Sequence, residues 1–485
     1  MKLNNPELLR SQCLINGEWC DALSGKREAV INPATGAELA SIPLVSEEET
    51  QQAINAAQLA QHSWKQLTAK QRSALLLVWA DRVLAAQEDL AQLMTAEQGK
   101  SLAEARGEVA YAASFITWFA EEAKRVDGAV LQAPQATQRL VVVKQPIGVC
   151  AAITPWNFPA AMITRKAGPG WAAGCTGVIR PASQTPFSAL AIAVLAERAG
   201  LPAGVCNVIT GPSKAIGGEL TANPDVRKLS FTGSTEVGAQ LLAQCAPTIK
   251  KTSMELGGNA PFIVFDDADL DAAVAGAVAS KYRNAGQTCV CTNRFLVQDG
   301  IYDAFAARLK AAVAKLKVGN GMDDGVTLGP LINQEAVEKV SEHIADAVKH
   351  GASVLLGGEP HALGHNFYAP TILTDVPREA KIFREETFGP VAPLIRFTHE
   401  DEAIELANDT PFGLASYFYS RDIGRVMRVA EALEYGIVGI NEGLISTEVA
   451  PFGGMKNSGL GREGSKYGIE DYLEIKYLCL GGLSA

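Results

Sequence analysis

Apolar residues recur in two alternating spacings between residues 147 and 256. Short apolar runs predict buried strands at 148–154, 176–181, 204–211, 227–233 and 250–256. Stretches with apolar residues at helical spacing lie between these runs and predict helices at 188–200 and 235–246. Because strands and helices alternate, we expect a parallel sheet with helices on both faces.

The same alternation restarts after a glycine-rich joint, "LGGN", at 256–259. A helix begins at the acidic run "DDADLD" and runs to about Asn284, since Asp is favoured at a helix start. The other elements expected here are strands at 260–265, 352–358 and 416–420 and helices at 332–350 and 400–408. The predicted fold is α/β with two doubly wound domains, the first from 1–127 and 147–256 and the second from 257–464. The 60–125 region of the first domain is predicted to be helical.

Two stretches fit neither domain and are predicted to be exposed strands. They are "GAVLQAPQATQRLVVVKQP" (128–146) and "EDYLEIKYLCL" (470–480). We expect 128–146 and 465–485 to pair into a projecting flap, although a plain surface hairpin is the alternative. Because unpaired strand edges invite another subunit, the flap predicts a homo-oligomer, either a dimer or a tetramer.

Composition and charge narrow the class of protein. The net charge is −10 with a pI near 5.3, and the sequence has no basic stripe, which argues against a nucleic-acid or anionic-membrane partner. No apolar run is long enough to span a bilayer, and the N-terminus does not resemble a secretory signal. The nine cysteines are scattered rather than spaced as a disulfide framework, so a cytoplasmic location is expected.

Cys289 and Cys291 lie two positions apart in "YRNAGQTCVCTNR" (282–294). They are interpreted as half of a metal site, a redox pair, or a nucleophile with a neighbour. A metal site is the weakest interpretation because no second CxC or CxxC exists, so we expect none. A nucleophilic thiol needs a lowered pKa or a nearby base, and the adjacent residues are polar and uncharged. An inert, half-buried cysteine therefore stays an alternative.

Three further features carry polar groups at predicted strand ends. "FTGSTEVG" (231–238) follows a strand and opens a helix, so its backbone N–H groups suit a phosphate, although the usual dinucleotide fingerprint is absent. Glu255 ends a strand, where open α/β sheets bind ligands. Asn157 in "TPWNFP" (154–159) either donates to an oxyanion or caps a turn.

These features occur together with other motifs in one order along the chain. The motifs are "TPWNFP", "FTGSTEVG", "MELGGNAPFIVFDDADLD", "GQTC", "EETFGP" (385–390) and "PFGGMKNSGLGREG" (451–464). Through these motifs the sequence resembles the NAD(P)-dependent aldehyde dehydrogenases, and the resemblance covers essentially the whole chain. The resemblance implies that the first domain binds the dinucleotide and the second is catalytic.

The resemblance also implies site residues. Cys289 is the nucleophile, Asn157 and the Cys289 N–H hold the oxyanion, and Glu255 activates water. The resemblance makes Cys291 only a neighbour of the nucleophile. The CVC spacing by itself leaves two interpretations of Cys291, a small apolar filler or a redox partner of Cys289, because a disulfide between residues two apart is strained and readily reduced. The implied cofactor-binding residues are Thr154, Pro155, Trp156, Arg180, Ser183, Gly233, Ser234, Gly238, Leu256, Glu386 and Phe388.

Within the family, the sequence most resembles the succinate-semialdehyde dehydrogenases of 4-aminobutyrate degradation. The segments that carry this resemblance are "MITRKAGPG" (162–170), "YRNAGQTCVC", "NEGLIS" (441–446) and "GREGSKYGIEDYLEIKY" (461–477). It implies that Arg165, Arg283 and Ser446 grip the distal carboxylate of the substrate, whereas the alternative for Arg165 is an ordinary surface arginine. Glutarate-semialdehyde dehydrogenases share nearly all these segments, and one methylene is worth only about 1–3 kcal/mol of discrimination.

The cofactor is expected to be NADP, with NAD used less well. Relatives usually carry Lys where this chain has Arg180, and NAD-preferring relatives commonly carry Glu where it has Ser183. Ser183 removes a carboxylate that would repel a 2′-phosphate, and Arg180 offers a cation that forks onto phosphate oxygens. The alternative is that Arg180 points outward and selectivity is weak.

Two other classes of protein are weighed against a dehydrogenase. A thiol hydrolase needs a histidine base, and no histidine lies near the motif segments. A non-catalytic member of the family would usually have lost Cys289 or Glu255, and both are present.

Overall fold

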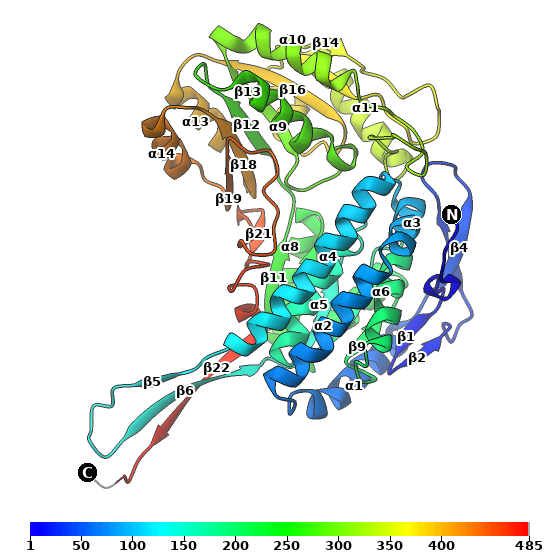
Figure 1. Ribbon diagram of the computed structural model, residues 1–485, viewed down its shortest axis with the longest axis vertical. Helices are drawn as coiled ribbons and strands as arrows, with labels where there is room; N and C mark the ends of the chain where they lie inside the picture. Colours follow the sequence, from blue (N-terminus) through cyan, green and yellow to red (C-terminus); the bar gives the residue numbers. More distant parts are fainter. Residues whose placement is uncertain (484–485) are drawn as a thin grey trace.

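Two large sheets and a small projecting sheet form the framework of the computed structural model, which describes residues 1–483 (Figure 1). In spatial order, the first sheet contains β2 (Glu18–Cys20), β1 (Cys13–Ile15), β9 (Cys206–Val208), β8 (Thr176–Arg180), β7 (Val149–Ile153), β10 (Val226–Thr232), β11 (Lys251–Glu255) and β21 (Gly459–Leu460). Its five central strands run parallel, and the strands at its edges are antiparallel. Every residue of β7 and β8 is buried, as expected of a parallel sheet covered on both faces.

Helices cover both faces of the first sheet and enclose two apolar cores. One core contains residues of α2 (Ala69–Ala85), α3 (Gln87–Gln98), α4 (Leu102–Glu122), α5 (Ala161–Ala173) and α6 (Pro186–Arg198). Its largest buried side chains include Trp64, Trp79, Phe115 and Phe119. The other core contains residues of α1 (Glu47–Trp64), α7 (Ser213–Ala222) and α8 (Thr235–Cys245). The two cores confirm the predicted doubly wound arrangement around this sheet.

The second sheet is also mostly parallel. Its strands are, in spatial order, β14 (Ser353–Leu356), β15 (Thr371–Thr374), β16 (Val391–Phe397), β13 (Thr292–Gln298), β12 (Ala260–Val264), β18 (Ala415–Tyr419) and β19 (Ile437–Ile440). Only β14 pairs in an antiparallel direction among them. The accompanying helices are α9 (Leu270–Tyr282), α10 (Tyr302–Val313), α11 (Gln334–Lys349), α12 (Lys381–Arg384), α13 (Glu400–Asn408) and α14 (Ile423–Ala432). The α/β fold class is thereby confirmed.

The predicted flap is present and projects from the rest of the molecule (Figure 1). It consists of β5 (Ala129–Leu131), β6 (Arg139–Pro146) and β22 (Leu473–Leu480), with β6 in the middle. β6 and β22 pair in antiparallel register from Pro146–Leu473 to Arg139–Leu480. Residues 484–485 of the predicted flap range lie outside the described residues. The remaining strands form two small pairs, β3 (Arg27–Ile31) with β4 (Glu38–Pro43) and β17 (Phe412–Gly413) with β20 (Met455–Lys456).

One strand crosses the boundary that was drawn between the two domains. β21 lies in the range given to the second domain, yet it pairs with β11 at the edge of the first sheet. The C-terminal loop therefore connects the two sheets beside Glu255. The domain ranges themselves stay a prediction.

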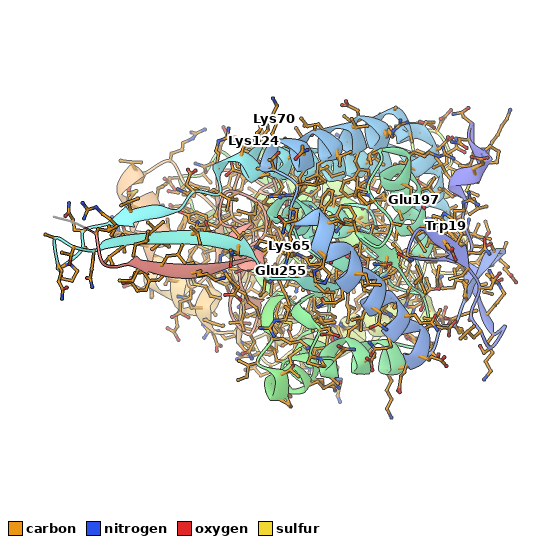
Figure 2. The ribbon with its side chains drawn as sticks, turned by 90° about the horizontal axis from the view of Figure 1, so that it is seen from below. Trp19, Lys65, Lys70, Lys124, Glu197 and Glu255 are labelled. Atoms are coloured by element: carbon orange, nitrogen blue, oxygen red, sulfur yellow. The ribbon has the colours of Figure 1, made fainter. Side chains whose placement is uncertain are left out.

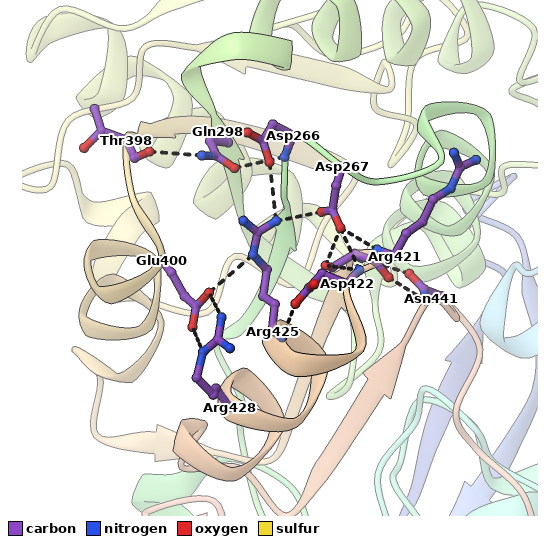
Figure 3. A network of polar contacts seen from close by, with 11 residues as sticks. Asp266, Asp267, Gln298, Thr398, Glu400, Arg421, Asp422, Arg425, Arg428 and Asn441 are labelled. Carbon is purple, nitrogen blue, oxygen red and sulfur yellow. Dashed lines mark hydrogen bonds and ion pairs between the residues drawn. The ribbon is translucent and has the colours of Figure 1, made fainter.

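An ionic network closes one end of the second sheet (Figure 3). Arg425 pairs with Asp267 at 2.7 Å and with Glu400 at 3.3 Å, and Asp267 also accepts from the Ser420 hydroxyl at 2.9 Å. Asp267 follows β12 and Ser420 follows β18, so the network ties together the carboxyl ends of these adjacent strands. The strand order of the sheet reverses between them, which is where open α/β sheets usually bind ligands. In this sheet, that position is filled by ion pairs.

Among residues 1–483, none of the helices combines the length and the apolar character needed to cross a membrane. At the N-terminal end of the chain, Trp19 of β2 donates its indole N–H to Glu197 of α6 at 2.9 Å, which attaches the first hairpin to the helical layer (Figure 2).

Candidate active site

Cys289 lies in the wall of a cavity of about 320 Å³, called here the first cavity. Arg165, Arg283 and Ser446 line the same cavity, although they come from α5, from the end of α9 and from the C-terminal region. The apolar part of the wall includes Tyr111, Phe158, Met162 and Phe452. The three residues predicted to bind a carboxylate and the predicted nucleophile therefore line one cavity.

A second cavity of about 400 Å³ also has Cys289 and Met162 in its wall. Cys289 therefore lies where the two cavities meet. Eight other predicted residues line the second cavity: Pro155, Trp156, Asn157, Gly233, Ser234, Leu256, Glu386 and Phe388.

The second cavity fits the shape and chemistry of a nicotinamide dinucleotide. It lies at the carboxyl ends of β7 and β10, between which the strand order of the first sheet reverses, as in other dinucleotide-binding sheets. Ser234 caps α8, so the N–H groups of this helix start are available to a phosphate. The hydroxyls of Thr154 and Thr232 are buried beside the cavity and have no hydrogen-bond partner within residues 1–483. The donor set and the place in the sheet thus suit the cofactor implied by the sequence.

Four of the predicted cofactor residues, Thr154, Arg180, Ser183 and Gly238, lie outside this cavity wall. Gly238 packs against Leu256 instead, and a Cβ at residue 238 would come within 2.4 Å of the Leu256 side chain. Ser183 lines a neighbouring third cavity of about 440 Å³, which shares Gln184 with the second.

Arg180 is held by its own neighbours. Its guanidinium donates to the Gly211 carbonyl at 3.1 Å and to the Ser213 hydroxyl at 2.7 Å. Burial lowers the pKa of Arg180, and Glu28 opposes this shift. Arg180 therefore lies within the protein rather than pointing outward, at the end of β8, just before Ser183.

The loop before Cys289 has an unusual backbone. Asn284 and Ala285 have φ values of 52° and 54°, a left-handed conformation that costs energy for non-glycine residues. Gly286 follows, and a Cβ there would meet the Gly389 carbonyl oxygen at 2.2 Å. The helix predicted to run to about Asn284 therefore ends at Tyr282, because the chain turns sharply to present Cys289.

Burial is the largest influence on the pKa of the Cys289 thiol. It raises the pKa of Cys289 to about 12, and Glu255 raises it further, whereas Arg165 and Arg283 act to lower it. Cys289 is thus a protonated thiol at neutral pH in the protein alone. Positive charge or a base brought to the site by its ligands is needed to form the nucleophilic thiolate.

Glu255 ends β11 and is buried, with 4% of its surface exposed. Its Oε2 atom is buried without a hydrogen-bond partner in the part of the chain that the structure describes. Burial raises the pKa of Glu255 well above its usual range, and the negative charge of Glu463 raises it further. A carboxyl group with a raised pKa is suited to take up and release a proton near neutral pH.

Asn157 faces the loop that carries the nucleophile. Only 4% of its surface is exposed, and its side-chain amide donates to the Gln287 carbonyl at 3.0 Å. An amide group carries two N–H donors, so one remains to bind an oxyanion beside Cys289. The structure therefore brings Asn157 and the predicted nucleophile together.

Arg165 is buried, so the alternative of an ordinary surface arginine is wrong. Its Nε lies 2.8 Å from Glu463 Oε2, and its guanidinium carbon lies 4.0 Å from the ring centroid of Phe452. Its Nη2 atom is buried without a hydrogen-bond partner in residues 1–483. Arg283 lies 5.5 Å from the ring centroid of Phe158. Both cations are therefore anchored while retaining donors toward the first cavity.

Cys291 is buried and its thiol points at a backbone carbonyl. Its Sγ donates to the Lys281 carbonyl at 3.4 Å. Burial raises the pKa of Cys291, and the Lys281 ammonium acts to lower it. The redox role of Cys291 stays a prediction.

Two charged residues of the site were not predicted from the sequence. Glu463 accepts from Lys166 Nζ at 2.6 Å, as well as pairing with Arg165. Lys166 and Glu463 lie within segments that carried the family resemblance, "MITRKAGPG" and "GREG". The sequence does not show that these two charged residues pair with each other. Their buried network depends on the pairing of β21 with β11, which places the C-terminal loop beside the first sheet.

The geometry defines a class of enzyme before any comparison is made. A half-buried thiol near an amide donor and a buried carboxylate, in the wall of a dinucleotide cavity, is typical of a cysteine-dependent dehydrogenase. The chain matches the model of the Aldehyde dehydrogenase family over residues 19–478, and it belongs to that family.

Individual relatives are similar over their whole length. The chain is 66% identical to the succinate-semialdehyde dehydrogenase [NADP(+)] GabD of Escherichia coli (strain K12), over 99% of this chain and 100% of the relative. It is also 66% identical to a glutarate-semialdehyde dehydrogenase of Pseudomonas putida (strain KT2440), with the same coverage. A crystal structure of succinate-semialdehyde dehydrogenase from Burkholderia pseudomallei superposes with a TM-score of 0.99 at 65% identity, covering 99% of this chain and 100% of that one.

Proposed function

We propose that this aldehyde dehydrogenase oxidises succinate semialdehyde to succinate with NADP as the hydride acceptor. The observation that carries the proposal is the presence of Arg165, Arg283 and Ser446 in the same cavity as Cys289. A small aldehyde with a distal carboxylate matches this cavity, since a desolvated carboxylate needs charge-assisted donors. Glutarate semialdehyde is the alternative substrate, because one further methylene changes the fit only modestly.

The first half of the reaction takes place on Cys289. The Cys289 thiol gives its proton to solvent, and the thiolate attacks the aldehyde carbon to form a thiohemiacetal, whose oxyanion accepts hydrogen bonds from the Asn157 amide and the Cys289 N–H. Bound NADP supplies the electrophilic ring that takes up a hydride. As the hydride leaves the substrate carbon, the thiohemiacetal becomes a thioester on Cys289. An oxyanion donor of this kind typically lowers a barrier by about 3 kcal/mol.

The second half of the reaction depends on Glu255. Its carboxylate removes a proton from water, and the water oxygen attacks the thioester carbon. The carbon–sulfur bond then breaks, which releases the carboxylic acid and returns the Cys289 thiol. The raised pKa of Glu255 makes it a stronger base than an ordinary carboxylate.

Arg165→Ala and Arg283→Ala are each expected to lower kcat/KM for succinate semialdehyde by about 10–100-fold, chiefly through KM, since each removes charge-assisted hydrogen bonds to the substrate. An uncharged aldehyde of the same chain length serves as the control and is expected to lose little. Steady-state kinetics with both substrates make the comparison. Equal losses for the two aldehydes would mean that the arginines serve only the fold.

The preference for NADP is tied to the third cavity. Ser183 lines this cavity and carries no negative charge. Arg180 ends β8, shortly before Ser183 in the chain. Glu28, also in the cavity wall, opposes the binding of a phosphate. Ser183→Glu is expected to reverse the order of kcat/KM, from NADP above NAD to NAD above NADP. Ser183→Gln matches the size of Glu without its charge and should keep the NADP preference. A wild-type enzyme that already favours NAD would contradict this assignment.

We also propose that the protein is a cytoplasmic homo-oligomer. The flap exposes apolar side chains on its two outer strands, with Val130 of β5 75% exposed and Ile475 and Tyr477 of β22 70% and 57% exposed. Such an apolar edge is stabilised by pairing with another copy of the chain. Sedimentation of the full-length protein is expected to show a dimer or tetramer, and Ile475→Glu/Tyr477→Glu a smaller species. A monomeric wild-type protein would exclude this assembly.

A further inference from the structure

Asn157 is held in place from its backbone side by a buried ion pair. The Asn157 carbonyl accepts from Lys100 Nζ at 2.8 Å, and Lys100 forms a salt bridge with Glu108 of α4. Only 1% of either charged side chain is exposed. The Lys100 ammonium also lies 4.1 Å from the ring centroid of Phe158, the residue next to Asn157. These contacts with the Asn157 carbonyl, Glu108 and Phe158 hold the Lys100 ammonium in place.

Glu108 attaches the same pair to the helix that follows Asn157. Its second oxygen, Oε1, accepts from the backbone N–H groups of Ala160 at 2.9 Å and Ala161 at 3.2 Å, at the start of α5. Both ends of the segment from Asn157 to α5 are thus anchored to Glu108. The start of α5 binds Glu108 directly, and Asn157 is linked to it through Lys100. A carboxylate with these partners has little freedom to move.

A second carboxylate of α4, one turn earlier, holds the nucleophile loop. Glu104 Oε1 accepts from the backbone N–H of Asn284 at 2.7 Å. The Asn284 side-chain amide in turn donates to the Asn157 carbonyl at 3.0 Å. Both donors to this carbonyl, Lys100 and Asn284, are therefore anchored on the same face of one helix.

We propose that Lys100 and Glu108 are positioning residues that fix Asn157 relative to Cys289, so that α4 sets the spacing of the two oxyanion donors. The inference rests on the proposed function, in which Asn157 binds the oxyanion. The physical reason is that a donor stabilises the transition state only when it is aimed at the developing charge beforehand. A displacement of about 1 Å in such a group can cost about 100-fold in rate.

The test measures the rate constant of the single-turnover burst of reduced cofactor at saturating NADP and succinate semialdehyde. Lys100→Met is expected to slow the burst by about 10–100-fold, with little change in the KM for the aldehyde. The same change in an Asn157→Ala background is expected to slow it no further, since Lys100 acts through Asn157. An equal loss in both backgrounds, or no loss in either, would overturn the proposal.

A companion variant separates positioning from folding. Lys100→Met alone leaves the buried Glu108 carboxylate unpaired and is expected to lower the midpoint of thermal unfolding. Lys100→Met/Glu108→Gln removes both charges, so the midpoint should largely recover while the burst stays slow. Recovery of the burst together with the midpoint would show that the pair serves stability alone.

The chain offers a matched control in Glu97. This buried carboxylate caps α6 as Glu108 caps α5, accepting from the N–H groups of Phe187 at 2.7 Å and Ser188 at 2.8 Å. Glu97→Gln is expected to lower the unfolding midpoint without slowing the burst. A slow burst in this control would show that any loosened helix start impairs the reaction, against a specific role for Lys100 and Glu108. A wild-type protein that forms no reduced cofactor from succinate semialdehyde would instead contradict the proposed function, and an unaltered rate of its formation in Asn157→Ala would contradict the oxyanion assignment.

Discussion

Cys289→Ala is expected to abolish aldehyde oxidation while the protein still binds NADP. The loss is expected to be at least about 10⁴-fold in kcat, as for other enzymes that lose a covalent nucleophile. The reason is that, within residues 1–483, Cys289 is the only thiol that lines both cavities, whereas Cys291 is buried with its sulfur turned to the Lys281 carbonyl. The measurements are the steady-state formation of reduced cofactor and the affinity for NADP by calorimetry.

Cys291→Ala is the matched control for this experiment. It removes a thiol of the same loop and is expected to leave turnover close to that of the wild type. If Cys289→Ala retained oxidation and Cys291→Ala lost it, the roles assigned to the two cysteines would be reversed. Loss of NADP binding in Cys289→Ala would show that the substitution acts on the fold of the loop.

Glu255→Gln is expected to permit one turnover and then stop. Thiohemiacetal formation and hydride loss take place on Cys289, so a burst of reduced cofactor equal to the enzyme concentration should remain. Steady-state turnover should fall by about 10²–10⁴-fold, the usual contribution of a general base. Rapid-mixing absorbance measures both phases. An absent burst with NADP still bound would show that Glu255 acts before the thioester forms.

The pH dependence of thioester hydrolysis offers a second measure of Glu255. Only its ionised form accepts a proton from water, and burial followed by the Glu463 charge raises its pKa. Hydrolysis by the wild type should therefore increase with pH through a midpoint above the usual range of a glutamate. Glu255→Gln has no such group and should lack this rise, whereas an unchanged profile would assign it to another residue.

Much of the fold follows from the sequence because the buried parallel strands are continuous apolar runs. β7, β8, β10 and β11 lie within a few residues of their predicted positions. In contrast, α5 was not predicted, since its sequence contains Gly168, Pro169 and Gly170, which are poor helix formers. Packing overrides this preference: Gly168 lies against Phe119 of α4, and Gly170 leaves room for the Tyr472 ring.

The site residues were predicted largely through the family resemblance, and the structure shows why residue patterns alone were insufficient. Cys289 and Asn157 belong to separate loops and Glu255 ends β11, so their approach depends on contacts between distant elements. The link between Glu104 and Asn284 spans 180 positions, and the pair of Arg165 with Glu463 depends on the C-terminal loop. The spacing of residues along the chain does not reveal such contacts, so the roles of Lys100, Glu108 and Glu463 were not predicted.

In the proposed reaction, the first cavity selects a short aldehyde with a distal carboxylate, and Cys289 carries its acyl group as a thioester. Mass spectrometry of Glu255→Gln, mixed with NADP and equal amounts of succinate semialdehyde, glutarate semialdehyde and an uncharged aldehyde of similar length, tests it most directly. We predict that the Cys289 peptide gains a succinyl group as the main adduct. A main adduct from the uncharged aldehyde, or an adduct on any residue other than Cys289, would contradict the account.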